Sequence, residues 1–183
     1  MDTETALKIA TELLAPWTRS ATNPEANRLV VSISRDNLKK AVQALLDAHW
    51  GYLSCIFGVD FPGNLGPQPE EKQWQRLNES EFLQAARQEG IVRVHYVFCN
   101  GAACVTLRVA PHYSSLHVPS ICDLIPSASL MERELMEMFG VIVDGTPDTR
   151  HLLLPDQWPD GEYPLRKGWK GLEKELPESE EVD

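Results

Sequence analysis

The sequence predicts an α+β fold, in which a small mixed β-sheet has its helices mainly on one face and an extended, proline-rich C-terminal arm follows. Three observations predict it. Amphipathic helical patterns alternate with short β-branched runs over residues 1–109, and "CNGA" separates two of these runs as a hairpin turn. Four prolines then interrupt residues 145–172, here called the C-terminal segment. We expect an α+β domain over 1–144, the C-terminal segment, and an acidic, solvated tail without fixed structure over 173–183.

The composition limits the class of protein. The chain has 183 residues, of which 43% are hydrophobic, which is enough for one domain with a real core. It has no apolar run long enough to cross a membrane. Its first ten residues begin acidic and become amphipathic, so we expect no secretory signal there. A net charge of −10 argues against binding to nucleic acid. The four cysteines lack C-x-x-C spacing, so we expect reduced thiols in a cytoplasmic protein.

The first elements follow from hydrophobic periodicity. "TETALKIATELLAP" predicts a helix that ends before Pro16, and residues 28–34 form a short β-branched strand. The next helix has Asp36 as its N-cap and Gly51 just after its end, with His49 on its apolar face. Residues 52–60 then read as a buried strand.

The middle of the chain predicts a hairpin. After a short helix over 80–90, apolar runs flank the Asn-Gly turn, and alternate residues of the first run share one face. That shared face consists of Val92, Val94, Tyr96 and Phe98. Residues 110–120 read as loop, and a helix follows that begins after Ser127 or Ser129 and ends at Gly140.

The helix that contains "MERELMEMFG" has almost no polar face, so we expect it to be buried on several sides. Its apolar stripe predicts that Glu134 is buried among large side chains and pairs with a cation, of which Arg150 is the favoured candidate. We therefore expect Glu134→Gln to impair assembly with a partner more than Glu132→Gln, whose side chain lies about 200° away around the helix.

The C-terminal segment has too many prolines for a regular element. A loop of this length inside a compact domain normally docks on something, and the sequence contains no second domain to receive it. We therefore expect it to wrap a partner chain. Residues 146–170 should be sensitive to protease in the isolated chain and protected in the assembly.

Enzymatic chemistry has little support. The chain lacks the glycine-rich nucleotide-binding motifs and the nucleophile motif G-x-S-x-G. Cys99 and Cys104 flank the hairpin turn and can face each other across the strands. We favour two packed thiols over a two-thiol metal half-site or a redox pair, because no other cysteine lies nearby in sequence to complete four metal ligands. The alternative function is a free-standing metal-dependent enzyme that uses Asp60, His112 and His117, although the two histidines match no local metal motif. We expect no bound metal, flavin or iron–sulfur cluster.

Residues 118–169 resemble the signature region of the thirty-kilodalton subunit family of respiratory complex I, which includes the matching component of energy-converting nickel–iron hydrogenases of the formate-hydrogenlyase type. The resemblance is dense after His117, and "LSCIFGVDFPG" is similar to the family's upstream strand. The motifs that carry it are "VPS" at 118–120, "ERE" at 132–134, Glu137, "FG" at 139–140, "PD" at 147–148, Arg150, "LL" at 152–153, "PD" at 155–156, Trp158 and "PLRK" at 164–167.

Two departures refine the resemblance. Thr146 stands where the family usually has histidine, and "WPDGEYPLRK" is longer than the compact form of NADH:quinone oxidoreductases. The longer form is similar to that of formate-hydrogenlyase-type hydrogenases.

The resemblance implies a structural subunit without cofactors or a catalytic site of its own, which supports electron transfer in a complex-I-like redox complex. It also implies packing in the peripheral arm beside a hydrogenase-like large subunit and a neighbouring iron–sulfur subunit. The chain would then lie on the inner face of the cell membrane and touch it only through the complex. The expected interface residues are Glu132, Arg133, Glu134, Phe139, Asp148, Arg150, Leu153, Trp158, Leu165 and Arg166.

Overall fold

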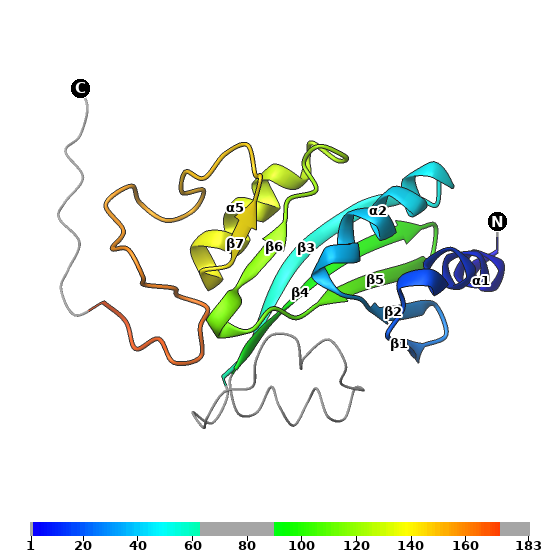
Figure 1. The fold of residues 1–183 in the computed structure, drawn as a ribbon, viewed down its shortest axis with the longest axis horizontal. Helices are drawn as coiled ribbons and strands as arrows, with labels where there is room; N and C mark the ends of the chain where they lie inside the picture. Colours follow the sequence, from blue (N-terminus) through cyan, green and yellow to red (C-terminus); the bar gives the residue numbers. More distant parts are fainter. Residues whose placement is uncertain (1, 63–89, 173–183) are drawn as a thin grey trace.

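A computed structural model describes residues 2–62 and 90–172 (Figure 1). Its main sheet has five strands in the order β1-β2-β5-β4-β3. The strands are β1 (Ser20–Glu25), β2 (Arg28–Ser32), β3 (Tyr52–Phe61), β4 (Ile91–Asn100) and β5 (Ala103–Val109). The β2–β5 pair is parallel and the other neighbours are antiparallel, which confirms the predicted mixed sheet.

A second, two-stranded parallel sheet and three α-helices complete the regular elements of the described residues. The small sheet pairs β6 (His117–Pro119) with β7 (Ile142–Asp144). The helices are α1 (Thr3–Leu14), α2 (Leu38–Asp47) and α5 (Ala128–Phe139). Short 3-10 helices occupy Ala15–Trp17, Arg35–Asn37 and Tyr113–Ser115. No helix in these described ranges has the length and apolar character that a membrane crossing requires.

The β4–β5 hairpin forms where the Asn-Gly sequence predicts it. Asn100 pairs with Ala103 around a two-residue turn, and Gly101 there has a φ of +58°. Val94, Tyr96 and Phe98 are all at most 1% exposed, as the alternation of the strand requires. The intervening side chains therefore lie on the opposite face of the sheet.

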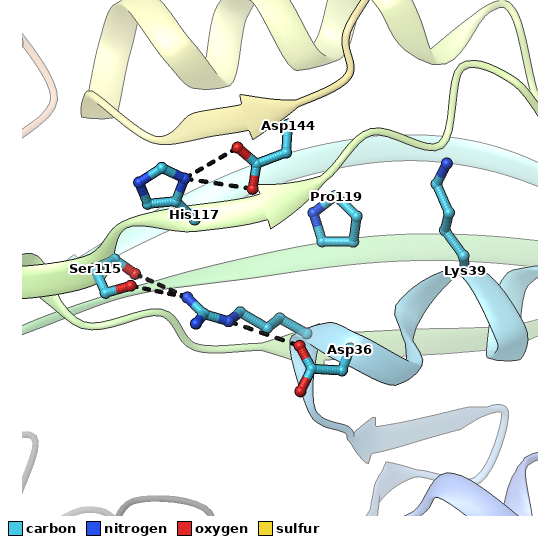
Figure 2. Close-up of a pocket in the computed structure, with 7 residues that line it drawn as sticks. Asp36, Lys39, Ser115, His117, Pro119 and Asp144 are labelled. Atoms are coloured by element: carbon cyan, nitrogen blue, oxygen red, sulfur yellow. Dashed lines mark hydrogen bonds and ion pairs between the residues drawn. The ribbon is translucent and has the colours of Figure 1, made fainter. Parts of the chain in front are cut away.

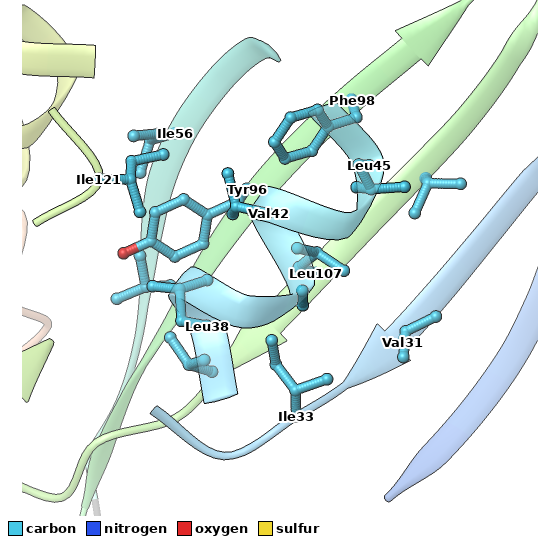
Figure 3. Close-up of a cluster of buried hydrophobic side chains, with 14 of the residues drawn as sticks. Val31, Ile33, Leu38, Val42, Leu45, Ile56, Tyr96, Phe98, Leu107 and Ile121 are labelled. Carbon is cyan, nitrogen blue, oxygen red and sulfur yellow. The ribbon is translucent and has the colours of Figure 1, made fainter. Parts of the chain in front are cut away.

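The described helices cover one face of the main sheet. Figure 3 shows Leu38, Val42 and Leu45 of α2 beside Tyr96 and Phe98, which come from β4. Helix α5 covers the β3 end of the same face, because Gly58 lies opposite Val94 and an added Cβ there would be 2.7 Å from the Phe139 ring. The sequence therefore predicted the layer arrangement of these helices correctly.

The end of α2 differs from its prediction. The helix starts after Asn37 rather than Asp36 and ends at Asp47, and His49 is exposed with a φ of +49°. The expectation that His49 lies on the apolar face is therefore wrong. The early end of the helix brings the next residue, Trp50, into the core, where its indole N–H donates to the Ala6 carbonyl at 2.8 Å.

Three strands were not anticipated. Strand β1 is an exposed, polar edge strand without hydrophobic alternation, and β6 and β7 have only three residues each, so none carries a periodic signal. Strand β6 falls within the region expected to be loop. The helix predicted over 80–90 and the tail over 173–183 lie outside the described residues.

Candidate subunit interface

Helix α5 organises the candidate interface. It ends at Phe139 and is capped by Gly140, which has a left-handed φ of +65° and donates its backbone N–H to the Met136 carbonyl at 2.8 Å. The helix lies against β3 on one side, and the C-terminal segment passes close to it on another (Figure 1). Its acidic residues consequently meet three different environments.

Glu132 is 1% exposed and binds residues 120–122, which precede α5 in the chain. Its carboxylate accepts hydrogen bonds from the Ser120 hydroxyl and the Ile121 backbone N–H, both at 2.8 Å, and from the Cys122 thiol at 3.1 Å. Burial, together with the Glu132 charge, raises the pKa of the neighbouring Tyr96 phenol far above its usual range. A buried carboxylate needs such donors, because desolvation is otherwise unfavourable.

Glu137 holds the start of the C-terminal segment. Its two oxygens accept the backbone N–H groups of three successive residues, Leu152 to Leu154, over 2.9–3.3 Å. His151 Nδ1 lies 3.4 Å from the same carboxylate. Successive backbone N–H groups that converge on one anion form a nest, which binds negative charge without any basic side chain.

Glu134 is exposed, so the prediction that it is buried and pairs with Arg150 is wrong. Arg150 instead pairs with Asp148, its Nη2 lying 2.7 Å from a carboxylate oxygen. The error has a physical cause. The sheet and the C-terminal segment each cover one side of α5, and the apolar stripe did not show that Glu134 lies on neither of these sides. In the sequence, the only sign of the two buried acids, Glu132 and Glu137, is that each is a charged residue in a helix with almost no polar face.

Asp148 and Arg133 form a second contact between the C-terminal segment and α5. Arg133 Nη1 lies 3.4 Å from the Asp148 carboxylate, and Arg133 also donates to the backbone carbonyls of Arg150, at 2.8 Å from Nε, and of His151. The hydrogen bond from Arg150 and the charge of Arg133 hold the pKa of Asp148 well below its usual range. Arg133 therefore binds backbone as well as charge.

Asp60 anchors the far end of the C-terminal segment. This carboxylate, 3% exposed at the end of β3, accepts the Lys167 backbone N–H at 2.8 Å and the Tyr113 hydroxyl. Arg166 Nη1 lies 3.7 Å from it, and Arg166 Nε donates to the Phe139 carbonyl at 2.6 Å. The Arg166 guanidinium also stacks 4.2 Å from the Tyr113 ring centroid.

These contacts correct the premise that the chain offers no docking place for its C-terminal segment. Glu137, Arg133 and Asp60 bind the segment at its first and last thirds. Within the segment, Trp158 and Trp169 lie with ring centroids 6.0 Å apart, and both indole N–H groups donate to Glu162, one to its carbonyl and one to its side chain. The segment thus has a defined path over its own domain.

The same anchors leave large apolar side chains in solvent. Leu153 is 63% exposed and Leu165 is 52% exposed, although their backbone N–H groups are bound by Glu137 and by the Met138 carbonyl. Two of the expected interface residues, Glu132 and Phe139, are buried in the chain's own core. These two residues attach α5 to the rest of the domain, whereas the two leucines lie on the outer surface of the C-terminal segment.

The residues of the alternative enzyme have separate partners. Asp60 is buried beneath Arg166, whereas His117 Nδ1 lies 3.0 Å from Asp144 at the surface. The backbone of His112 pairs with that of Ile91 in an isolated β-bridge. Within the described ranges, no three His, Cys, Asp or Glu side chains are grouped so that they could hold a metal ion.

His117 does line a surface pocket of about 420 Å³, shown in Figure 2. The cations of this pocket face acids: Lys39 pairs with Asp123 at 2.9 Å, and Arg35 Nε lies 3.9 Å from Asp36. With its charges balanced in this way, the pocket is not an obvious site for an anionic ligand.

Comparisons with known proteins agree with this arrangement. The family model described as "Respiratory-chain NADH dehydrogenase, 30 Kd subunit" matches residues 31–175. The chain is 33% identical to formate hydrogenlyase subunit 5 of Escherichia coli strain K12 over 144 residues, which are 77% of this chain and 21% of that protein. It is 42% identical to a subunit of the NADH-quinone oxidoreductase of Saccharopolyspora erythraea over 140 residues, 75% of this chain and 47% of that protein.

A solved structure shares the fold. The structure of the membrane-bound sulfane sulfur reductase, an archaeal respiratory membrane complex, contains a chain that matches with a TM-score of 0.65. The match covers 92% of this chain and 88% of that one at 18% identity, so it concerns the fold alone. The family match over residues 31–175 includes both β3 and α5 as well as the C-terminal segment. The chain therefore belongs to the family of the 30 kDa subunit of respiratory-chain NADH dehydrogenase.

Proposed function

We propose that this chain is a cofactor-free structural subunit of a complex-I-like redox complex, either an energy-converting hydrogenase or an NADH:quinone oxidoreductase. In this proposal it packs beside the hydrogenase-like large subunit and a neighbouring iron–sulfur subunit, and it supports electron transfer by holding them in place. It lies on the cytoplasmic side of the membrane and contacts the bilayer only through the complex.

The lengths of the relatives support an assembly role. The chain matches about a fifth of formate hydrogenlyase subunit 5, so in that relative the same domain is joined to a much longer polypeptide. It matches about half of the NADH-quinone oxidoreductase relative from Saccharopolyspora erythraea. A domain that belongs to chains of such different length fits the role of a module that packs against other parts of one complex.

The observation that carries the proposal is that Leu153 and Leu165 have exposed side chains on a backbone held by hydrogen bonds. Both leucines are more than half exposed, while the backbone beside them is fixed by Glu137 and by the end of α5. Fixing a backbone while leaving its apolar side chains in water is unfavourable for the isolated chain. A partner that buries them recovers this free energy and binds a surface that is already ordered.

We propose that residues 145–172 form the contact segment of this interface. Its polar members are Asp148, Arg150 and Arg166, with Arg133 and Glu134 on the adjoining helix, and Trp158 adds a half-buried aromatic side chain. Arg150 has 81% of its side chain exposed and Glu134 is exposed, so both are available to a partner at the rim. Rim charges of this kind contribute more to orientation than to affinity.

Single variants test the proposal in the assembled complex. Leu153→Asp and Leu165→Asp should each reduce recovery of the complex roughly tenfold, because a charge replaces an apolar side chain that the partner buries. Recovery is measured by affinity purification through the large subunit, with quantitative mass spectrometry of this chain. Both side chains are exposed, so the isolated variants should keep the circular dichroism and melting temperature of the unmodified chain.

Tyr52→Asp is the matched control, since Tyr52 is 63% exposed on β3 and lies outside the C-terminal segment. Its recovery should equal that of the unmodified chain. Equal recovery for all three variants would show that the two leucines do not contact a partner. Elemental analysis and absorption spectra of the purified chain test the absence of metal, flavin and iron–sulfur cluster separately.

A further inference from the structure

Two thiols face each other on the sheet face opposite the helices. Cys99 of β4 and Cys104 of β5 are direct cross-strand partners, and their sulfur atoms lie 3.4 Å apart. Both residues are half-buried, and both thiols are free. Phe98 and Ala103, their neighbours in sequence, are buried on the helix face, so the strand alternation places the two sulfurs on the other side.

The hydrogen-bond pattern shows what kind of pair this is. Cys104 donates its backbone N–H to the Asn27 carbonyl at 2.8 Å, which lies away from β4. Cys99 and Cys104 therefore occupy a non-hydrogen-bonded position, in which opposite Cα atoms are about 4.5 Å apart and side chains are closest. That separation lies inside the range that a disulfide tolerates, and each sulfur needs to move by less than about 1 Å to form the bond.

We propose that Cys99 and Cys104 form a thiol–disulfide exchange site whose oxidising substrate is a low-molecular-weight disulfide of the glutathione type. Oxidation closes a reversible cross-strand disulfide at the turn end of the β4–β5 hairpin. The inference is independent of the proposed function, because it rests on the register of two strands and the distance between two sulfurs.

The reaction has two balanced steps. The Cys99 thiolate attacks one sulfur of the small disulfide, so a protein–small-molecule disulfide forms and one small thiolate leaves. Cys104 then loses its proton and attacks the Cys99 sulfur, which forms the cross-strand bond and releases the second small thiolate. The two protein thiols are oxidised, the small disulfide is reduced to two thiols, and the protons from the protein protonate them.

The order of attack follows from the surroundings of Cys104. Burial and the contact with Cys99 raise the pKa of the Cys104 thiol, which makes Cys104 a weaker nucleophile than an ordinary cysteine. Cys99 is therefore the first attacking thiol in this proposal, although the exchange site itself requires only that the two sulfurs lie side by side. Cys104 acts as the resolving thiol once the mixed disulfide lies beside it.

The other cysteines are less well placed. Cys55 lies on the same sheet face as the pair, opposite the helices, but its cross-strand partner is Val97, beside an irregularity in the β3–β4 register. Burial also raises the pKa of its thiol. Cys122 lies in the chain before α5 and donates its thiol hydrogen to Glu132. Of the four cysteines, all of which lie within the described ranges, Cys99 and Cys104 alone are paired directly across two strands.

The test oxidises the full chain with oxidised glutathione, blocks the remaining thiols with iodoacetamide, and measures intact mass and peptide linkage by mass spectrometry. The unmodified chain should accept two fewer alkyl groups after oxidation and carry no glutathione, with the link mapped to Cys99 and Cys104. Cys55→Ser should behave in the same way. Dithiothreitol should restore full alkylation.

The single variants trap the intermediate. Cys104→Ser should accumulate a glutathione adduct at Cys99, and Cys99→Ser should accumulate one at Cys104, because neither variant has the second thiol that resolves the adduct. Full alkylation of the unmodified chain across all glutathione ratios would overturn the proposal. A link that involves Cys55, or one between two chains, would overturn it as well.

Discussion

Arg166, in the C-terminal segment, lies over Asp60, at the end of β3, with its Nη1 atom 3.7 Å from the carboxylate. The same carboxylate accepts the backbone N–H of the next residue, Lys167, at 2.8 Å. One buried acid thus fixes two successive residues of a segment that has no helix or strand in its described course. This contact joins the segment to the sheet.

Asp60→Asn should destabilise this joint. The change removes the charge opposite Arg166 and leaves a largely buried guanidinium without its anion, which costs roughly 3 kcal/mol. We expect a lower free energy of unfolding by about that amount and faster proteolysis within residues 163–169. Urea unfolding followed by tryptophan fluorescence, together with limited proteolysis, measures both effects.

The control for this change is Asp123→Asn. Asp123 forms an ion pair with Lys39 at 2.9 Å, but its side chain is 59% exposed. An ion pair in solvent contributes little to stability, so this variant should unfold at nearly the same urea concentration as the unmodified chain. If the two variants unfold at the same urea concentration, the Asp60–Arg166 contact is no stronger than a surface pair and the C-terminal segment is held by other groups.

Glu137→Gln and Glu132→Gln should each destabilise the fold by roughly 2–3 kcal/mol, because each amide replaces a carboxylate that accepts several buried hydrogen bonds. Glu134→Gln, at an exposed position, should change the free energy of unfolding by about 0.5 kcal/mol or less. Thermal and urea unfolding of the three isolated variants give the comparison directly.

The same three variants reverse the order of assembly that the helix pattern predicted. Recovery of the complex should fall for Glu132→Gln and Glu137→Gln, since both loosen the surfaces that flank α5. Glu134→Gln should assemble nearly normally. A stronger assembly defect for Glu134→Gln than for the other two would mean that the Glu134 charge is buried by a partner rather than lying at the rim of the interface.

Gly58→Ala should push α5 away from β3. An added Cβ would lie 2.7 Å from Cδ2 of Phe139 and 3.0 Å from Cδ1 of Leu135, which is closer than packed carbons allow. Overpacking of this kind costs roughly 1–3 kcal/mol. Gly168→Ala is the control because nothing lies within 4 Å of its added Cβ. Melting temperatures of the two variants test the difference, and equal values would contradict a close α5–β3 contact.

His95 predicts a dependence of stability on pH. Its ring stacks on Phe57, with the ring centroids 4.7 Å apart, and burial together with the charges of Arg108 and Arg93 lowers its pKa from 6.5 to about 4. The unfolded chain binds the proton more readily, so the contribution of His95 is complete above about pH 6.5 and is lost as the pH falls toward about 4. The free energy of unfolding, measured across this window, should fall less for His95→Gln than for the unmodified chain. Parallel curves would contradict the lowered pKa.

The sequence alone determined the elements that have a period or a turn motif. The apolar stripe of residues 3–14, the alternation along β4 and the Asn100-Gly101 turn each depend on neighbours a few residues away, so local pattern was sufficient. The motifs after His117 identified the family by their spacing. Strand β1 and the pair β6–β7 escaped this kind of inference because short or fully exposed strands have no hydrophobic period.

Only the tertiary structure decided which acids of α5 are buried. Helix geometry fixes the angles between Glu132, Glu134 and Glu137, but it does not state which side of the helix meets the sheet, the chain before it, or the C-terminal segment. The donors that stabilise the two buried carboxylates come from residues 120–122 and 152–154, on either side of the helix in sequence. Burial of a charge depends on such distant donors, because a carboxylate leaves water only where hydrogen bonds replace those it loses.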